Sequence, residues 1–578
     1  MEKPNTNLLI KFVLYLLILF GLWTSLHYTF DVWGPDSDES FPATIWQGIH
    51  RYGLEFISSV DYTPDNWLFS LIPIYFILFA MFGVNGYVIV LVGWLIFIFS
   101  AFLTGYIIKK TTDNNISALI GTVLSLFVGI YNSPASWLVY SISHNITMLW
   151  TLIGIAITIS IYLNKNSKKK ILHFLLFFLV TFIAGISDPW FNAAFVVPMV
   201  ITLSIFYFKD REYRSESKIL ILLTLLTWFM AYSRVFGMLY FLPKSSYTFV
   251  PSLYQLKENI KFYLISIVNF LNIAQAFSIA KVFGVVFLLL SILVLCIIVV
   301  RLYKFYNKLT LTSIQKFLFI FFILSILVIS VAFLLSNFPH GSYSIRFLYN
   351  IFYGLIILFV AFLSITPISK KEKTVIISYI IFYILVGIGN QPKIWLNPEI
   401  KLKTLGVEDI ISQLELNNLH FGYGDYWTSQ ANAISVLTKG KITVVGITDS
   451  FTPHLQASKL YFNTKYIPKE KYYFMIIPNS PNVEWRFSLE DSIKKSEFYF
   501  GQPVKIIHLK NHTILVWNHP LDFDSMKLKE FSRVFKAAET FLSKGNNLSN
   551  LYPQYLEERG YLDKSFGYET GPAMNWTR

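Results

Sequence analysis

A short acidic run near the N-terminus has residue types that can catalyse transfer of an activated group. Asp36, Asp38 and Glu39 follow closely on the first apolar stretch of the chain. A carboxylate that is partly desolvated has a raised pKa and becomes a better general base for a hydroxyl proton. The run therefore predicts a catalytic loop. The alternative is an acidic outer loop that only follows membrane topology.

The run belongs to a longer acidic segment, residues 31–65, in a chain that is otherwise basic. The formal net charge of the chain is +14, whereas this segment has a single arginine, Arg51. Carboxylates close to a membrane are costly and are usually kept for function. The segment contains seven of them: Asp31, Asp36, Asp38, Glu39, Glu55, Asp61 and Asp65.

Basic residues near the ends of apolar stretches are candidates for binding a phosphate. Arg346 and His340 lie in NFPHGSYSIR, and Lys244 follows another apolar stretch. The planar fork of an arginine binds two phosphate oxygens at once. The alternatives are an arginine that extends to the membrane surface and a lysine that meets lipid headgroups.

Three further residues are candidates for contacting the acceptor or the sugar. Asp188 in SDPW is either an acceptor or metal ligand or a turn residue. His144 in SISHN either donates hydrogen bonds to a sugar or phosphate or is structural, and Trp46 either stacks on a sugar or belongs to an aromatic belt. Asp38 and Asp188 are also the candidate ligands for a divalent metal, Mg2+ or Mn2+.

The composition identifies a membrane protein. Of the 578 residues, 54% are hydrophobic and 14% are charged, whereas soluble domains have roughly 25% charged residues. Repeated apolar runs of about 20 residues are typical of transmembrane helices. The basic charge is expected in cytoplasmic loops that face anionic lipid, and no nucleic-acid partner is predicted. The single cysteine, Cys296, excludes disulfides within the chain.

The apolar runs predict eleven spans, with a cytoplasmic N-terminus and every short lysine-rich loop on the cytoplasmic side. The lysine-rich loops fall on one side only if Trp67–Gly83 does not cross the membrane. This segment is therefore predicted to be re-entrant or interfacial. Lys244–Ala280 is predicted to be an outer segment with a helix that lies on the membrane. The predicted spans are Leu8–Leu26, Tyr87–Ile108, Ile116–Ile130, Ile146–Leu163, Ile171–Ile186, Phe191–Phe208, Ile219–Met238, Val282–Val300, Phe317–Leu335, Phe347–Ile365 and Val375–Ile388.

From about residue 390 the long apolar runs stop and charged residues become frequent. Residues 390–578 are predicted to form a mixed α/β domain outside the membrane, and residues 1–389 a transmembrane domain with an acidic outer loop at 29–66. The predicted strands are KITVVGI, YYFMIIP and PVKIIHLKNHTILVWN, the last with a turn at Lys510-Asn511. The predicted helices are VEDIISQLELN and SMKLKEFSRVFKAAETFLSK.

Several catalytic motifs are missing from the sequence. It has no P-loop, no HExxH zinc helix and no GxSxG nucleophile elbow. The fragment GYGDYW, residues 422–427, is rich in glycine, but it follows no clear strand and is a weak candidate for a phosphate loop.

The order of these features resembles the GT-C superfamily of membrane glycosyltransferases, such as protein mannosyltransferases and lipid A aminoarabinose transferases. Asp38-Glu39 matches the acidic pair that follows the first span in that family. ATIWQGIHRYG and DNWLFSLIPIYFILFAMFG look like its two juxtamembrane helices. SIRFLYN is similar to the RYL-type start of a late span, and GDYWTSQANAISVLTKGKITVV to an ADYW-type opening of the outer domain. The chain departs from the family at TPDNW and at Phe347 after Arg346.

The resemblance implies an inverting transfer of a sugar from a polyprenyl phosphate to an envelope acceptor. Asp36 or Asp38 would be the base or would orient a metal, and a metal is used by only some members. The expected location is a bacterial inner membrane, with the C-terminal domain outside the cytoplasm. The rival hypotheses are a transporter or flippase of a lipid-linked saccharide and a non-catalytic assembly or sensor protein.

Overall fold

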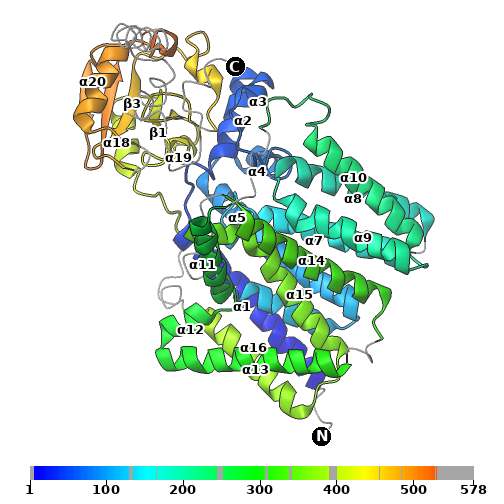
Figure 1. Ribbon diagram of the computed structural model, residues 1–578. Coiled ribbons are helices and arrows are strands. Elements are labelled where there is room, and N and C mark those ends of the chain that lie inside the picture. The colour runs from blue at the N-terminus through cyan, green and yellow to red at the C-terminus, as the bar shows by residue number, and fades with distance from the viewer. Residues whose placement is uncertain are drawn as a thin grey trace. The chain divides into compact units, whose positions relative to one another are not determined.

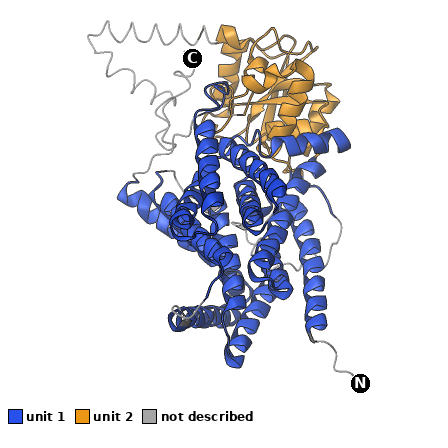
Figure 2. Ribbon diagram, turned by 90° about the vertical axis from the view of Figure 1, so that its right-hand side faces the viewer, with its two compact units in different colours: residues 1–34, 64–82, 86–403 blue, residues 35–63, 83–85, 404–578 orange. Residues whose placement is uncertain are grey.

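The computed structural model describes residues 6–128, 135–164, 166–243, 251–305, 310–337, 341–389, 400–454, 456–482, 485–526 and 529. The chain forms two compact units, which Figure 2 shows in different colours. The first contains residues 1–34, 64–82 and 86–403, and the second contains residues 35–63, 83–85 and 404–578.

The first unit is helical (Figure 1), and among its described residues ten helices are long and apolar enough to cross a membrane. These helices correspond to ten of the eleven predicted spans, and their length and composition fit a multi-pass membrane protein. They are α1 (Thr6–Val32), α5 (Gly86–Thr112), α7 (Asn145–Leu163), α8 (Ser167–Ser187), α9 (Val197–Lys209) with the π-helical turn η2 (Asn192–Val196), α10 (Arg214–Tyr232), α13 (Lys281–Phe305), α14 (Ser313–Leu335), α15 (Tyr349–Ile365) preceded by η3 (Ser342–Leu348), and α16 (Lys370–Gly389).

The predicted third span differs from the structure. Its counterpart is α6 (Asn115–Leu126), a helix of 12 residues, which is about 18 Å long and shorter than a bilayer core. The side chain of Asn114 caps the start of α6, and residues 121–126 are all buried against neighbouring helices. The predicted span ended at residue 130, and its last two residues lie outside the described part of the chain.

Two segments that were predicted to lie outside the spans form shorter or bent helices. Within Trp67–Gly83, α4 (Ile72–Phe82) has 11 residues and is too short to cross a bilayer. Within Lys244–Ala280, α11 (Leu253–Phe270) and α12 (Ile273–Ile279) meet at a bend of 68°. The bend lies at Asn272, which has a φ of +60°. The pair is apolar enough to count as an eleventh, broken span, which differs from the predicted surface helix.

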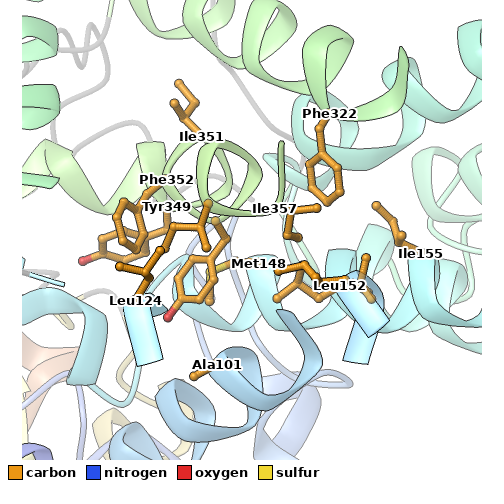
Figure 3. Close-up of a cluster of buried hydrophobic side chains, with 14 of the residues drawn as sticks. Ala101, Leu124, Met148, Leu152, Ile155, Phe322, Tyr349, Ile351, Phe352 and Ile357 are labelled. Carbon is orange, nitrogen blue, oxygen red and sulfur yellow. The ribbon is translucent and has the colours of Figure 1, made fainter. Parts of the chain in front are cut away.

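The helices of the first unit share one hydrophobic core with α15 at its centre. Figure 3 shows side chains from α5, α6, α7 and α14 that point toward this helix. The burial of these apolar side chains stabilises the packing of the helices and thereby fixes the positions of their ends. The labelled core residues are Ala101, Leu124, Met148, Leu152, Ile155, Phe322, Tyr349, Ile351, Phe352 and Ile357.

The second unit contains a five-stranded sheet in the order β2-β1-β3-β5-β4, which confirms a mixed α/β domain. β1 (Phe421–Asp425), β2 (Thr443–Ile447) and β3 (Tyr473–Pro478) are parallel, and β5 (His512–Trp517) pairs antiparallel with β3 and β4 (Lys505–His508). The described helices of its C-terminal part are α18 (Glu408–Leu416), α19 (Ala431–Leu437), η4 (Lys459–Phe462) and α20 (Leu489–Phe500).

The interior strand β1 was not recognised in the sequence, where GYGDYW was said to follow no clear strand. Glycines are rare in strands, but these two are required by packing. A Cβ atom on Gly422 would lie 2.3 Å from the carbonyl oxygen of Phe474, and one on Gly424 would lie 2.6 Å from Oγ of Ser429. The three predicted strand runs and the first predicted helix are confirmed, while most of the second helix, from residue 527 on, lies outside the described residues apart from residue 529.

Most of the acidic loop belongs to the second unit, although it was assigned to the transmembrane domain. Its helices α2 (Phe41–Tyr52) and α3 (Glu55–Ser59) pack on α19 and η4. A single β-bridge joins Val60 to Ser458. α2 ends at Gly53, whose φ of +74° favours glycine. The division by sequence position failed because residues far apart in the chain fold together.

Candidate functional site

A buried carboxylate and a buried histidine form the centre of a polar cluster in the first unit. Asp188 Oδ2 lies 2.7 Å from His144 Nδ1, and the two side chains are 3% and 2% exposed. Thr147 donates its hydroxyl proton to the same Oδ2, and the backbone N–H of Trp190 donates to Oδ1 at 2.9 Å. Because a carboxylate only accepts, it keeps a proton on Nδ1 and fixes the orientation of the imidazole.

The ends of three helices supply this cluster. His144 is the last residue before α7, Asp188 is the first residue after α8, and Arg346 lies in η3 just before α15. The π-helical turn η2 follows Asp188 closely, and such turns are frequent at functional sites. The sequence predicted these three residues as site candidates, and the structure places them in one region of the first unit.

A second carboxylate, Asp65, faces the other side of the imidazole. Its Oδ2 lies 4.0 Å from His144 Nε2, and its side chain is 25% exposed. Burial is the main cause of a raised pKa of Asp65; the charges of His144 and Arg346 lower this pKa and that of Asp188 raises it further. The cluster thus runs from a buried carboxylate through a buried imidazole to a carboxylate that solvent reaches.

The backbone around Asp65 is held in a fixed conformation. The side chain of Asn66 donates to the carbonyl oxygen of Ile186 at 3.0 Å, next to the end of α8. Trp67 has a φ of +55°, a region that bulky residues rarely adopt, and its ring contacts that of His144 with centroids 5.6 Å apart. Such strain persists where surrounding contacts determine the conformation, which is common at functional sites.

Arg346 lies on aromatic rings. Its Cζ atom lies 5.5 Å from the ring centre of Trp137, 5.6 Å from that of Tyr343 and 5.4 Å from that of Phe347. Its Nε atom is buried, and within the described residues it has no hydrogen-bond partner. In this part of the chain Arg346 also forms no ion pair. A guanidinium that is partly desolvated and lacks a counter-ion is suited to bind an anion.

The acidic run 36–39 forms its own network within the second unit. The backbone N–H of Glu39 donates to Asp36 Oδ1 at 2.8 Å, which closes a tight turn. Tyr426 donates its hydroxyl proton to Asp38 Oδ1 at 2.8 Å, and Ser37 donates its own to the carbonyl oxygen of Tyr426 at 2.6 Å. Asp36 and Asp38 are half-buried, and Glu39 is fully buried.

The segment after β1 holds this run in place. The side chain of Gln430 accepts from the N–H of Ser37 at 2.9 Å, and that of Asn432 donates to the carbonyl oxygen of Ser37 at 3.0 Å. The hydroxyl oxygen of Tyr426 lies 2.5 Å from Oε1 of Gln456, and its ring stacks on His454 with centroids 3.9 Å apart. Burial, followed by the charges of nearby aspartates, raises the pKa of Tyr426 well above its usual value.

We expect Tyr426→Phe to loosen the acidic run. The variant keeps the ring contacts but removes the hydroxyl proton that Asp38 accepts, and an unsatisfied buried polar group costs about 1–3 kcal/mol. Thermal unfolding of the full-length protein in detergent measures the loss, and proteolysis within residues 35–40 measures the loosening. Tyr472→Phe is the control, because Tyr472 is partly buried and packs against the core of the sheet. Unchanged protection of the run by Tyr426→Phe would contradict the expectation.

The remaining predicted residues lie apart from these contacts or outside the described part. Trp46 is a half-buried residue of α2, in the second unit, and its ring packs against His50. His340 and Lys244 lie outside the described residues. For the divalent metal, no group of three or more suitable side chains occurs in the described ranges. Both oxygens of Asp188 accept hydrogen bonds from neighbouring groups of the cluster.

The sequence analysis missed three residues of these networks. Asp65 was counted only as one carboxylate of the acidic segment, and Thr147 and Tyr426 were not singled out. The available signals were TPDNW, where a carboxylate precedes an apolar helix, and GDYW, which the resemblance had already matched. A scan of protein-family models and a search of curated proteins found no match to this chain.

Proposed function

We propose that this chain is a glycosyltransferase of a bacterial inner membrane that uses a polyprenyl-phosphate sugar as donor. The product is a glycosylated envelope acceptor, a lipid, glycan or protein, formed on the outer face of the bilayer. The proposal places the N-terminus in the cytoplasm and the C-terminal domain outside. The GT-C resemblance supplies the reaction class, and the chemistry of the described side chains supports it.

The observation that carries the proposal is that Arg346 is a partly desolvated cation with no counter-ion among the described residues. Its guanidinium is held by three aromatic rings, its buried Nε has no partner among the described residues, and it forms no ion pair there. In the proposed reaction Arg346 binds the donor phosphate and stabilises the charge that develops on the leaving phosphate. A carboxylate of segment 31–65 takes the proton of the acceptor hydroxyl.

The reaction then proceeds as a single displacement at the anomeric carbon. The acceptor oxygen loses its proton to the carboxylate and forms a bond to this carbon. The bond from this carbon to the phosphate oxygen breaks with its electron pair, and polyprenyl phosphate leaves. Attack on the face opposite the phosphate inverts the configuration.

The rival function is transport of a lipid-linked saccharide. Transporters use broken helices and place ionisable residues near the middle of the membrane, and the bend between α11 and α12 is a feature of this kind. The ionisable residues of the cluster, however, lie at helix ends rather than within helices. This placement favours an enzyme that works at the membrane surface.

Glycan and lipid analysis of envelopes from cells that lack the protein tests the proposal. A missing sugar that returns with the wild-type gene, and not with a gene for the Asp36→Asn/Asp38→Asn/Asp65→Asn variant, is the expected result. An unchanged sugar profile would contradict the transferase. Accumulation of an intact lipid-linked saccharide on the cytoplasmic side, with no loss of covalent transfer in isolated membranes, would establish the transporter instead.

A further inference from the structure

The base of the proposed reaction is one of several carboxylates in segment 31–65, and their surroundings differ. Asp38 accepts the hydroxyl proton of Tyr426, and Asp36 accepts a backbone N–H within its own turn. Hydrogen bonds to a carboxylate stabilise its charged form and make it a weaker base. These contacts of Asp36 and Asp38 hold the acidic run in its folded conformation.

Asp65 differs from these two residues in that burial is the main influence on its carboxyl group. It is near a second carboxylate, that of Asp188, and burial raises its pKa, while a quarter of its side chain remains exposed. The charged and titratable groups that act on it are His144, Asp188 and Arg346. A base with a pKa raised toward the working pH accepts a proton most effectively.

The imidazole behind Asp65 is positioned for this role. Asp188 holds Nδ1 of His144 at 2.7 Å, so Nε2 points the other way, toward Asp65 Oδ2 at 4.0 Å. Nε2 is buried and has no hydrogen-bond partner in the described part of the chain. Nε2 of His144 can therefore accept a hydrogen bond from the proton that Asp65 receives. Thus Asp65 is the exposed member of this cluster, and His144 and Asp188 are buried.

From this geometry we propose that Asp65 is the group that accepts the proton of the acceptor hydroxyl, and that His144 and Asp188 are its positioning residues. The proposal rests on the proposed glycosyl transfer. It assigns the base to a residue that the sequence analysis did not choose. In the reaction the hydroxyl proton passes to Asp65 Oδ, while the electron pair of the breaking bond goes to the phosphate that Arg346 binds.

Purified full-length protein in detergent, added to membranes of the deletion strain, tests this assignment. Those membranes retain unused donor and acceptor, so the rate of product formation is measured by mass spectrometry without knowing either molecule beforehand. Asp65→Asn should lower the rate by roughly 10²-fold or more. Asp61→Asn is the matched control, because Asp61 lies in the same segment and pairs with Lys459 at 2.8 Å on the surface.

The pH profile separates a positioning role from a structural one. The wild-type rate should rise with pH through the raised pKa of Asp65, because the base must first lose its own proton. Asp188→Asn removes a negative charge that raises this pKa. The rising limb of its profile should therefore move to lower pH, whereas a purely structural defect lowers the rate equally at every pH.

The stability of Asp65→Asn gives an independent readout. A carboxyl group with a raised pKa contributes stability as the pH falls through that pKa and costs stability above it, where the charged form predominates. The variant should therefore have a higher Tm than the wild type at neutral and alkaline pH. A structural carboxylate would give a lower Tm.

The outcomes distinguish the two proposals. If wild-type protein forms no product in deletion-strain membranes, the proposed function fails. If wild-type protein forms product and Asp65→Asn forms it at the same rate, only the assignment of the base is overturned. The same holds if the rising limb of the pH profile of Asp188→Asn lies at the same pH as that of the wild type. Loss of transfer in Asp36→Asn/Asp38→Asn that exceeds the loss in Asp65→Asn would return the base to the acidic run.

Discussion

Arg346→Ala should abolish transfer while leaving the protein folded. The side chain forms no ion pair among the described residues, so its removal breaks none there. Losing a group that stabilises transition-state charge typically costs roughly 10²–10³-fold in rate. Arg346→Lys should restore only part of the activity, because an ammonium group lacks the planar fork. The measurement is the rate of product formation in deletion-strain membranes.

The matched control for this variant is Arg214→Ala. Arg214 also lies near an aromatic ring, with its Cζ 6.0 Å from the ring centre of Tyr207, but it is exposed. Its removal should leave the rate unchanged. Equal rates for Arg346→Ala and wild type would contradict the phosphate-binding role, and the proposed donor would then need another cation.

Asp188→Ala should strongly destabilise the first unit. The change leaves the buried Nδ1 of His144 and the hydroxyl of Thr147 without their acceptor. Leaving a buried hydrogen-bond donor without its acceptor costs about 1–3 kcal/mol, and this change affects two donors. Asp188→Asn keeps an oxygen acceptor and should cost less. Thermal unfolding in detergent, followed by tryptophan fluorescence, measures the difference.

A surface carboxylate gives the control for Asp188→Ala. Asp113 forms an ion pair with Lys109 at 3.0 Å and is 98% exposed, so Asp113→Ala should change stability by less than about 1 kcal/mol. Similar losses for the two variants would show that the Asp188–His144 pair contributes no more than a surface pair. The cluster would then be dispensable for the fold, and only its role in transfer would remain to be measured.

The sequence by itself determined the class of the protein and most of its elements. Apolar runs of span length are a strong signal because a bilayer requires about 20 apolar residues for each crossing. Ten predicted spans therefore match long helices, and the short strand-like runs KITVVGI and YYFMIIP match strands. The types of Arg346, His144 and Asp188, together with their positions at the ends of apolar runs, were also enough to select them as candidates.

Only the tertiary structure decided which of these residues work together. Asp65 and His144 are distant in the chain, and the proximity of their side chains follows from how α7, α8 and the segment before α4 pack. β1 was hidden because its glycines weaken the strand signal while the packing requires them. The pairing of Asp38 with Tyr426 joins residues almost 400 positions apart. Periodicity and composition are local properties, whereas hydrogen bonds between distant segments depend on the packing of the whole unit, which no local pattern encodes.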